Sequence, residues 1–360
     1  MESEDFSAAV TAALTALGTR LTAQVTALGP DAAPLVEQVE QLLQGGKRLR
    51  ASFAYWSFRA HGGPASGDWH VAAIRTAAAL EVFQAAALFH DDVFDAADTR
   101  RGHPSAHRAF EARHRAAGWQ GDPAAFGVST AVLLGDLALV AAQQELTTAL
   151  ALTSLGAEQR TRVQEAYNQM GLEVMVGQYL DVQAANAPWG DDPAADEARS
   201  RQIVTAKAAS YSVRYPLAIG ALLAGQDPQP IDRVGLPLGI AFQLRDDVLG
   251  VFGDEAETGK PVGGDLVEGK RTVLAARTLA LGTPQQQRTL RDGLGRPDLG
   301  RADIAAIQAA IRDSGAYASH ERLINELTVE AEAALAQCQL TDPGAARLRE
   351  TLARSVRRQA

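Results

Sequence analysis

Three aspartates lie close together near the end of a long apolar run. Asp91, Asp92 and Asp95 belong to the segment LFHDDVFDAADTRRG, residues 88–102. On a helix, their spacings of three and four residues place the carboxylates on one face. Two carboxylates about 4 Å apart repel each other by about 4 kcal/mol at an effective dielectric constant of 20. A bound cation removes this repulsion, so the pattern predicts a metal site; a solvated acidic helix end is the alternative.

A second acidic pair, Asp246 and Asp247, ends another apolar segment. Basic residues follow both clusters: Arg100 and Arg101 after the first, and Lys260, Lys270 and Arg271 after the second. Mg²⁺ is commonly held by one or two carboxylates together with substrate phosphates. Arginine binds phosphate with two parallel hydrogen bonds, and lysine acts as a point charge. The combination predicts a diphosphate held between Mg²⁺ ions and cationic side chains.

Helices must position these residues, because apolar residues recur at helical spacing and no alternating strand flanked by hairpin turns stands out. The predicted fold class is all-α, with one domain over residues 1–360. Helices are expected near residues 4–28, 31–44, 47–60, 69–97, 103–116, 125–152, 156–184, 195–225, 229–250, 265–281, 300–315, 318–337 and 342–357. The helix near 69–97 carries the first acidic cluster at its C-terminal end, where the helix dipole disfavours unpaired acids.

The bulk composition limits the classes of protein to consider. Hydrophobic residues make up 46% of the 360 residues, which suits a compact protein with a sizeable core. The net charge of -9 argues against a nucleic-acid surface. A single cysteine, Cys338, excludes an intramolecular disulfide framework. No run approaches the roughly 20 uncharged apolar residues of a membrane span, and the start MESEDFSAAV lacks the basic region of a signal peptide. We therefore expect no membrane span and a cytoplasmic location.

The order of the motifs resembles the trans-isoprenyl diphosphate synthases, also called polyprenyl synthetases. The segments that carry the resemblance are GGKRLR (45–50), HDDVFDAADTRRG (90–102), GQYLD (177–181), Lys207, FQLRDD (242–247) and GKPVGGDLVEGKRT (259–272). The resemblance implies antiparallel helices around a deep central cavity, usually in a homodimer. It also implies condensation of isopentenyl diphosphate with an allylic diphosphate (dimethylallyl, geranyl or farnesyl).

The same resemblance implies a role for each acidic residue. Asp91 and Asp95 would bind Mg²⁺ directly, with Asp92 close by or acting through water. Asp246 would hold a third Mg²⁺ ion, assisted by Asp247 through water.

The resemblance also divides the cationic residues between two substrates. Arg100, Lys207 and Lys260 would bind the diphosphate of the allylic substrate, and Lys47, Arg50 and Arg101 would bind isopentenyl diphosphate. Lys270 adds positive charge after the second acidic pair. Gln84 stands where some family members carry histidine, and Gln243 would lie beside the allylic site.

Two positions depart from the family pattern. Gly250 stands where many members have a third aspartate, and Ala208 follows Lys207 where threonine or serine is common. Gly250 keeps open the alternative of a noncatalytic subunit of a heteromeric synthase. A terpene cyclase of the same architecture is the other alternative, although such enzymes do not need the GGKRLR segment.

The wall below Asp91 is expected to set the length of the product. Ala86 and Ala87 lie about one helical turn before Asp91 and are too small to stop a growing chain. Phe83 lies about two turns before it and is the predicted floor, so the expected main product is geranylgeranyl diphosphate. The alternative is that Phe83 only packs between helices.

Overall fold

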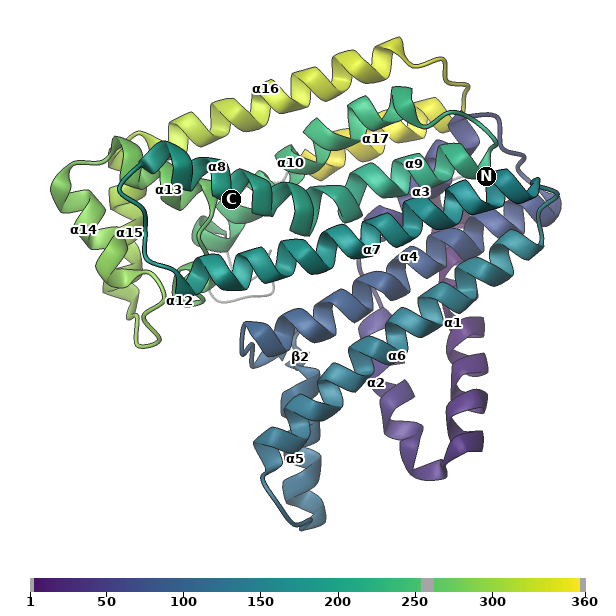
Figure 1. The fold of residues 1–360 in the computed structure, drawn as a ribbon, viewed down its shortest axis with the longest axis horizontal. Helices are drawn as coiled ribbons and strands as arrows, with labels where there is room; N and C mark the ends of the chain where they lie inside the picture. Colours follow the sequence, from purple (N-terminus) through teal and green to yellow (C-terminus); the bar gives the residue numbers. More distant parts are fainter. Residues whose placement is uncertain (1–2, 254–261, 357–360) are drawn as a thin grey trace.

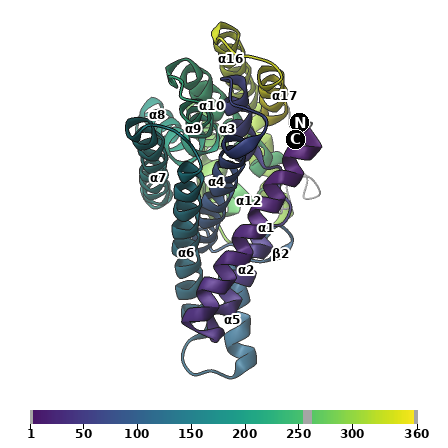
Figure 2. The same ribbon diagram turned by 90° about the vertical axis from the view of Figure 1, so that its right-hand side faces the viewer.

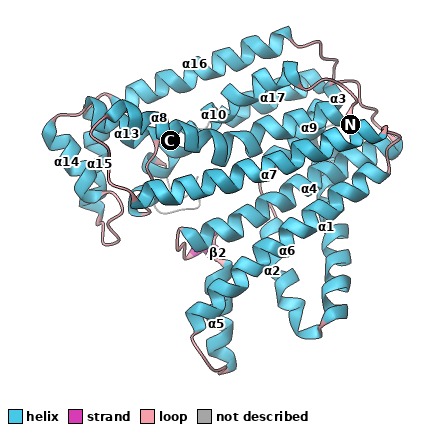
Figure 3. Ribbon diagram, viewed as in Figure 1, coloured by secondary structure: helices cyan, strands magenta, loops and turns pink. Residues whose placement is uncertain are grey.

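The chain is almost entirely helical in the computed structural model, which describes residues 3–253 and 262–356 (Figures 1 and 3). The first half contains α1 (Ser3–Leu28), η1 (Pro30–Ala32), α2 (Ala33–Leu43), α3 (Leu49–Ala60), α4 (Gly67–Phe94), α5 (Ala106–Ala117), α6 (Pro123–Ala151) and α7 (Ala157–Asn186). The second half contains α8 (Pro193–Ile203), the π-helix η2 (Val204–Arg214), α9 (Tyr215–Leu223), α10 (Gln229–Phe252), α12 (Gly264–Val267), α13 (Val273–Leu281), α14 (Pro284–Gly293), α15 (Arg301–Asp313), α16 (Ala316–Gln337) and α17 (Gly344–Val356). The predicted all-α class is confirmed.

The strands that the structure describes form one short hairpin directly after the first acidic cluster. β1 (Thr99–Arg100) pairs antiparallel with β2 (His103–Pro104). The two turn residues, Arg101 and Gly102, have φ angles of 52° and 77°. Positive φ at both positions is the geometry of the tight turns that match the twist of paired strands. The turn places Arg100 in a strand and Arg101 at its tip, so two adjacent arginines have different surroundings.

Helix α4 lies at the centre of the main hydrophobic core and packs against α1, α2, α3, α5, α6 and α9 (Figure 2). Alanines such as Ala77, Ala78 and Ala79 are fully buried along it. Small side chains let neighbouring helices approach closely, and alanine favours the helical conformation. The core therefore holds rigidly the helix that carries Asp91, Asp92 and Asp95.

A smaller hydrophobic cluster supports the end of α10. Val251 packs there with Leu266 of α12, Leu274 of α13 and Ile307 of α15. This cluster anchors the segment that follows Asp246 and Asp247.

Several predicted boundaries were wrong. Helix α4 ends at Phe94 rather than near residue 97, so Asp95 is its C-cap. The helix expected over 195–225 is divided into α8, η2 and α9, and the one expected over 265–281 into α12 and α13. Helix α14 was missed because its sequence PQQQRTLRDG has few apolar residues; it begins instead with a capping box between Thr283 and Gln286.

The expectation that no apolar run is long enough to cross a membrane does not hold by length and composition. By length and composition alone, α4 and α6 are apolar enough to cross a membrane. The apolar stretch of α4 is 72% buried inside the protein, as in the core helix of a soluble protein, whereas that of α6 is 39% buried. The open face of α6 therefore needs its own explanation.

Candidate functional site

One cavity of about 780 Å³ is lined by Asp91 of the first acidic cluster and by both residues of the second, whereas Asp92 and Asp95 do not line it. Its wall includes Asp91 from α4, Lys207 from η2, and Asp246 and Asp247 from α10. Further predicted residues line the same wall: Lys47, Arg50, Gln84, Arg100, Arg101, Gln243 and Lys270. The fold thus gathers side chains that lie far apart in the sequence. Lys260, which was also predicted to bind substrate, lies outside the described residues.

Asp91 sits among cations. Lys207 Nζ lies 3.2 Å from Asp91 Oδ1 and 2.5 Å from Asp181 Oδ2, and Arg100 Nη2 lies 3.8 Å from Asp91 Oδ2. Burial raises the pKa of Asp91, but the charges of Lys207 and Lys270 outweigh burial and lower the pKa to about 2. Asp91 is therefore ionised at neutral pH.

Asp95 shares one cation with two other carboxylates. Lys270 Nζ lies 3.2 Å from Asp95 Oδ2, 2.5 Å from Glu268 Oε2 and 3.5 Å from Asp265 Oδ1. Burial raises the pKa of Asp95 to about 6 although Lys270 lowers it, because the negative charges of Asp91 and Glu268 add to the effect of burial. Lys270 accordingly links the ends of α4 and α12.

Asp92 lies behind the wall of the cavity. Its side chain is 3% exposed, and Arg100 donates a 2.7 Å hydrogen bond from Nε to Asp92 Oδ1. A second guanidinium nitrogen of Arg100 also bonds to the same oxygen. The hairpin after α4 makes this contact possible by folding Arg100 back over the helix end. In this arrangement Asp92 orients Arg100 toward the cavity.

The second cluster has a different environment. Gln243 donates a 2.9 Å hydrogen bond to Asp247 Oδ1, whereas the buried Asp247 Oδ2 has no hydrogen-bond partner among the described residues. Burial, followed by the charge of Asp265, raises the pKa of Asp247 well above its usual value. Asp246, one residue earlier, is exposed. Asp247 therefore offers an unsatisfied oxygen beside an accessible carboxylate.

These donors fit Mg²⁺ that arrives with a diphosphate. Within residues 3–253 and 262–356, no three His, Cys, Asp or Glu side chains converge closely enough to hold a metal without further ligands. Mg²⁺ does not require such a cluster, since it retains waters and uses substrate phosphates beside one or two carboxylates. Asp91, Asp95 and Asp246 supply hard oxygen donors, and the unpartnered oxygen of Asp247 matches the same chemistry.

A second group of cations lies toward α3 and the hairpin. Arg50 Nη2 donates a 2.7 Å hydrogen bond to Ser212 Oγ, and the guanidinium lies 4.2 Å from the centroid of the Tyr211 ring. Arg101 Nη1 donates a 2.6 Å hydrogen bond to the carbonyl oxygen of Leu42. These contacts orient two cations along the wall that also contains Lys47.

Sequence reasoning missed several residues that hold this network together: Asp181, Tyr211, Ser212, Asp265 and Glu268. Asp181 is the last residue of the GQYLD segment, one of the segments that carry the family resemblance, so the sequence offered a signal for it. A Cβ added at Gly177 would lie 2.3 Å from the backbone nitrogen of Lys207, so α7 and η2 touch there through their backbones. Glycine permits that approach. It brings Asp181, one turn later, against Lys207.

The face of α4 that lines the cavity differs from the predicted one. Glu81, Gln84, Leu88 and Asp91 line the wall, whereas Phe83, Ala86 and Ala87 do not. The wall follows Leu88 and Gln84, three and seven residues before Asp91, rather than Ala87, four residues before it.

Phe83 is 3% exposed and belongs to an aromatic group behind the wall. Its ring packs edge-on against Tyr167 at 5.7 Å and lies 6.2 Å from Tyr211, measured between ring centroids. Tyr211 itself lines the cavity. The structure therefore places Phe83 behind Tyr211 rather than directly on the wall.

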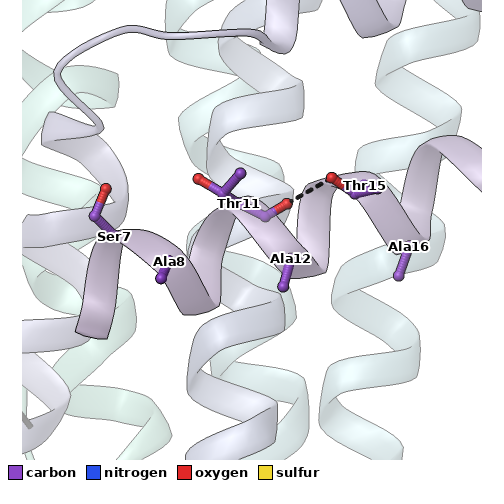
Figure 4. Close-up of a pocket in the computed structure, with 6 residues that line it drawn as sticks. All are labelled: Ser7, Ala8, Thr11, Ala12, Thr15 and Ala16. Atoms are coloured by element: carbon purple, nitrogen blue, oxygen red, sulfur yellow. Dashed lines mark hydrogen bonds between the residues drawn. The ribbon is translucent and has the colours of Figure 1, made fainter. Parts of the chain in front are cut away.

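A separate hollow on the surface of α1 offers no comparable chemistry (Figure 4). Small side chains line it: Ser7, Ala8, Thr11, Ala12, Thr15 and Ala16. The Thr15 hydroxyl donates a 3.0 Å hydrogen bond to the carbonyl oxygen of Thr11, within the same helix. With no ionisable lining side chain, this hollow is not a candidate active site.

Comparisons with known proteins agree with the geometry. The model of the polyprenyl synthetase family matches residues 33–311. Over 263 residues, the chain is 31% identical to geranylgeranyl diphosphate synthase of Sulfolobus acidocaldarius, which covers 72% of this chain and 71% of that protein. It is 32% identical to octaprenyl diphosphate synthase of Escherichia coli over 253 residues, covering 69% of this chain and 67% of the relative.

Solved structures resemble the whole chain. Geranylgeranyl pyrophosphate synthase from Corynebacterium glutamicum, complexed with isoprenyl diphosphate and magnesium, matches with a TM-score of 0.89 and 36% identity over 100% of both chains. The fold is thus that of the all-α isoprenyl synthases. The chain belongs to the polyprenyl synthetase family and is a trans-prenyltransferase.

Proposed function

We propose that this protein condenses isopentenyl diphosphate with an allylic diphosphate, in a Mg²⁺-dependent reaction, and forms mainly geranylgeranyl diphosphate. The observation that carries the proposal is a cavity that Asp91, Asp246 and Asp247 line together with Arg100, Lys207 and Lys270. Relatives that make geranylgeranyl diphosphate support the assignment, although the octaprenyl and geranylfarnesyl relatives show that the family makes several chain lengths.

In this proposal, three Mg²⁺ ions bind with substrate, held by Asp91 and Asp95 on one side and by Asp246 and Asp247 on the other. When bound, Mg²⁺ neutralises negative charge that develops on the departing diphosphate.

Lys207 and Arg100 contribute fixed positive charge to the same leaving group. Burial lowers the pKa of Lys207, but Asp91 and Asp181 outweigh it and raise the pKa, so the ammonium group stays charged. The ion pairs of Lys207 and Arg100 with Asp91 can exchange for contacts with diphosphate. Asp92 remains on Arg100 and positions it. By the same analogy, Lys260 would join this group, and Lys47, Arg50 and Arg101 would bind isopentenyl diphosphate, with Gln84 and Gln243 along the wall.

A condensation assay tests the proposal. Purified protein is incubated with Mg²⁺, isopentenyl diphosphate and each allylic primer, and the products are sized by chromatography. Geranylgeranyl diphosphate as the main product is expected. Release of a hydrocarbon would favour a terpene cyclase, and no product with any primer would favour a noncatalytic subunit.

A homodimer is part of the same proposal and accounts for the open face of α6. Large apolar side chains are exposed on α6 and α7: Val128, Val132, Leu133, Val140, Leu172, Met175, Val176, Tyr179 and Val182. Contiguous exposed apolar surface commonly marks a protein interface. Leu133→Glu on α6 is expected to give monomers by light scattering, whereas Leu281→Glu, at an exposed leucine of α13, leaves the dimer intact. A monomeric native protein would contradict the dimer.

The organisation as one domain over residues 1–360 and the cytoplasmic location also remain proposals. Thr341 supports the first, because its backbone N–H donates a 2.9 Å hydrogen bond to the carbonyl oxygen of Ala60 and so joins distant parts of the chain. Limited proteolysis that releases one resistant core, rather than two, is the expected result.

A further inference from the structure

The chain turns between α2 and α3 through residues 44–48, and this α2–α3 loop carries Lys47. The backbone φ angle is positive at Gly45 (69°), Gly46 (85°) and Arg48 (49°). Glycine adopts positive φ without steric cost, whereas arginine does not. A strained residue persists only where the surrounding structure holds it in place. The contacts of Arg48 must therefore fix the end of this loop.

The side chain of Arg48 is buried and joins two helices. Its Nη2 atom donates a hydrogen bond to the carbonyl oxygen of Leu43, the last residue of α2. Its Nη1 atom lies 3.6 Å from Glu81 Oε2 on α4, and the two side chains are 9% and 4% exposed. Basic side chains commonly bind the last carbonyl groups of a helix. Removing one partner of a buried ion pair leaves the other charge uncompensated. Arg48 thus ties the end of α2 to α4.

The other carboxylate oxygen of Glu81 caps α3. The backbone N–H of Ala51, the third residue of α3, donates a 3.1 Å hydrogen bond to Glu81 Oε1. N–H groups in the first turn of a helix lack carbonyl partners within that helix. A carboxylate at this end is favourable, and it usually comes from the residue that precedes the helix. Here α4 supplies it, so one carboxylate fixes both Arg48 and the first turn of α3.

The residues held in this way lie on the wall of the cavity. Lys47, Arg48, Arg50 and Glu81 all line it, and so does Arg101. Burial lowers the pKa of Arg101 and the charge of Glu81 raises it, whereas the charges of Arg48 and Arg50 lower it. These arginines repel one another, and Glu81 lies among them with the opposite charge. Glu81 therefore keeps the cations together before a diphosphate arrives.

We propose that Glu81 and Arg48 are positioning residues, which hold Lys47 and Arg50 in place for the diphosphate of isopentenyl diphosphate. The inference rests on the proposed function, since it assumes that Lys47 and Arg50 bind this substrate. Glu81 and Arg48 act through the α2–α3 loop and the first turn of α3. Their loss consequently weakens binding of isopentenyl diphosphate and leaves the allylic diphosphate, which other cations bind, almost unaffected.

Steady-state kinetics with the full-length protein test this difference between the two substrates. Glu81→Gln keeps the size of the side chain and an oxygen for the N–H of Ala51, but removes the charge that faces Arg48. At saturating farnesyl diphosphate, KM for isopentenyl diphosphate is expected to rise about tenfold, because the binding groups are misplaced. KM for farnesyl diphosphate and kcat are expected to stay within about threefold of native values. A purely structural role would lower stability without separating the two KM values.

Arg48→Gly separates the side chain from the strained backbone, because glycine accepts the positive φ at this position. KM for isopentenyl diphosphate is again expected to rise about tenfold. The double variant Glu81→Gln/Arg48→Gly is expected to stay within about threefold of Arg48→Gly, because residues that act as one unit are not additive. A further tenfold rise in the double variant would show independent action and would overturn the pairing.

Glu145→Gln is the matched control. Glu145 on α6 is also 4% exposed and pairs with an arginine, Arg75, whose Nε lies 2.7 Å from Glu145 Oε1. Glu145 does not line the cavity. This variant is expected to melt at a lower temperature and to keep both KM values within about threefold of native.

Hydrogen exchange of the backbone amides of residues 44–51, measured without substrate, gives a readout that does not depend on activity. Exchange is expected to be at least about threefold faster in Glu81→Gln and Arg48→Gly than in the native protein or in Glu145→Gln. Unchanged exchange in both variants, an unchanged KM for isopentenyl diphosphate, or an equal rise in both KM values overturns the inference. A native protein that condenses no primer would instead contradict the proposed function.

Discussion

The two acidic clusters contribute to the same cavity, the first through Asp91 and the second through both of its residues, but they are neutralised differently. Asp91 and Asp95 at the end of α4 lie within 3.2 Å of Lys207 and Lys270, respectively. Asp247 on α10 accepts a hydrogen bond from Gln243 on one oxygen, and its other oxygen has no hydrogen-bond partner within residues 3–253 and 262–356. The first cluster therefore carries built-in countercharges that a diphosphate can take over. The second cluster keeps a carboxylate oxygen without a hydrogen-bond partner among the described residues, and such an oxygen is suited to bind a metal ion.

The largest effect is expected at the first cluster. Asp91→Asn removes a carboxylate that is ionised at neutral pH and is expected to lower kcat about a thousandfold, as losses of groups that stabilise developing charge do. The matched control is Asp181→Asn, which also removes a partner of Lys207 but no proposed metal ligand, and about tenfold is expected there. Steady-state kinetics measure both. Equal losses in the two variants would mean that Asp91 acts only through Lys207.

At the second cluster we expect a smaller loss of function, together with a gain in stability when no metal is bound. Asp247→Asn should weaken Mg²⁺ binding about tenfold to a hundredfold. Without metal, its free energy of unfolding should rise by about 1 kcal/mol, because burial and the charge of Asp265 disfavour the ionised form of Asp247 and raise its pKa. Calorimetric melting with and without Mg²⁺ measures both. A lower melting temperature without metal would show that Asp247 is well stabilised as it stands and would remove the contrast between the clusters.

The wall beneath the first cluster is expected to change the product rather than the rate. Phe83→Ala opens space behind Tyr211 and should lengthen the main product by one isoprene unit, at a cost of about 3–5 kcal/mol in stability. Leu88→Phe, on the cavity face, should shorten it, and Ala87→Phe, off that face, should shorten it less. Chromatography of the products measures all three. Unchanged product lengths in every variant would mean that Phe83 only packs between helices.

The smallest effect at neutral pH concerns the support of α10. His320 Nε2 lies 3.0 Å from the Leu244 carbonyl oxygen, and burial lowers the pKa of His320 to about 4, although Leu244 raises it. Arg277 and Arg245 lower this pKa further, and Glu321 raises it. Between pH 4 and about 6.5 the unfolded chain binds more protons than the native protein, so acidification favours unfolding.

The contribution of His320 is complete above about pH 6.5 and is lost as the pH falls toward 4, at most about 3 kcal/mol. Urea unfolding at pH 7 and pH 5 measures it. His320→Gln should flatten the pH dependence in this window. An equally steep decline in that variant would assign the effect to other groups and not to the support of α10.

The sequence was sufficient to predict the helical class and the gathering of most site residues. Apolar periodicity located α4 and α10, and the two acidic clusters with their nearby cations indicated a diphosphate site. The local pattern was weaker where tertiary contacts decide the structure. The π-helical turns of η2 and the early end of α4 depend on packing around Lys207 and Asp95 rather than on residue preferences.

Two details could not be read from a single helix. The expected wall residue Ala87 is replaced by Leu88, because the orientation of α4 in the bundle selects the face that includes Gln84 and Asp91. The contact between Asp265 and Gly250 could not be predicted from the sequence. Gly250 lies fifteen residues earlier on another helix, and only the folded backbone brings the two residues together.

Lys270 touches Asp95 at the end of α4 and Asp265 beside α10. One side chain is thus a common neighbour of both halves of the site. The halves are consequently poor candidates for independent evolution, since a charge change in either one alters the electrostatic field of the other. A redesign of the metal chemistry in this scaffold should therefore vary both clusters and Lys270 as one inherited unit.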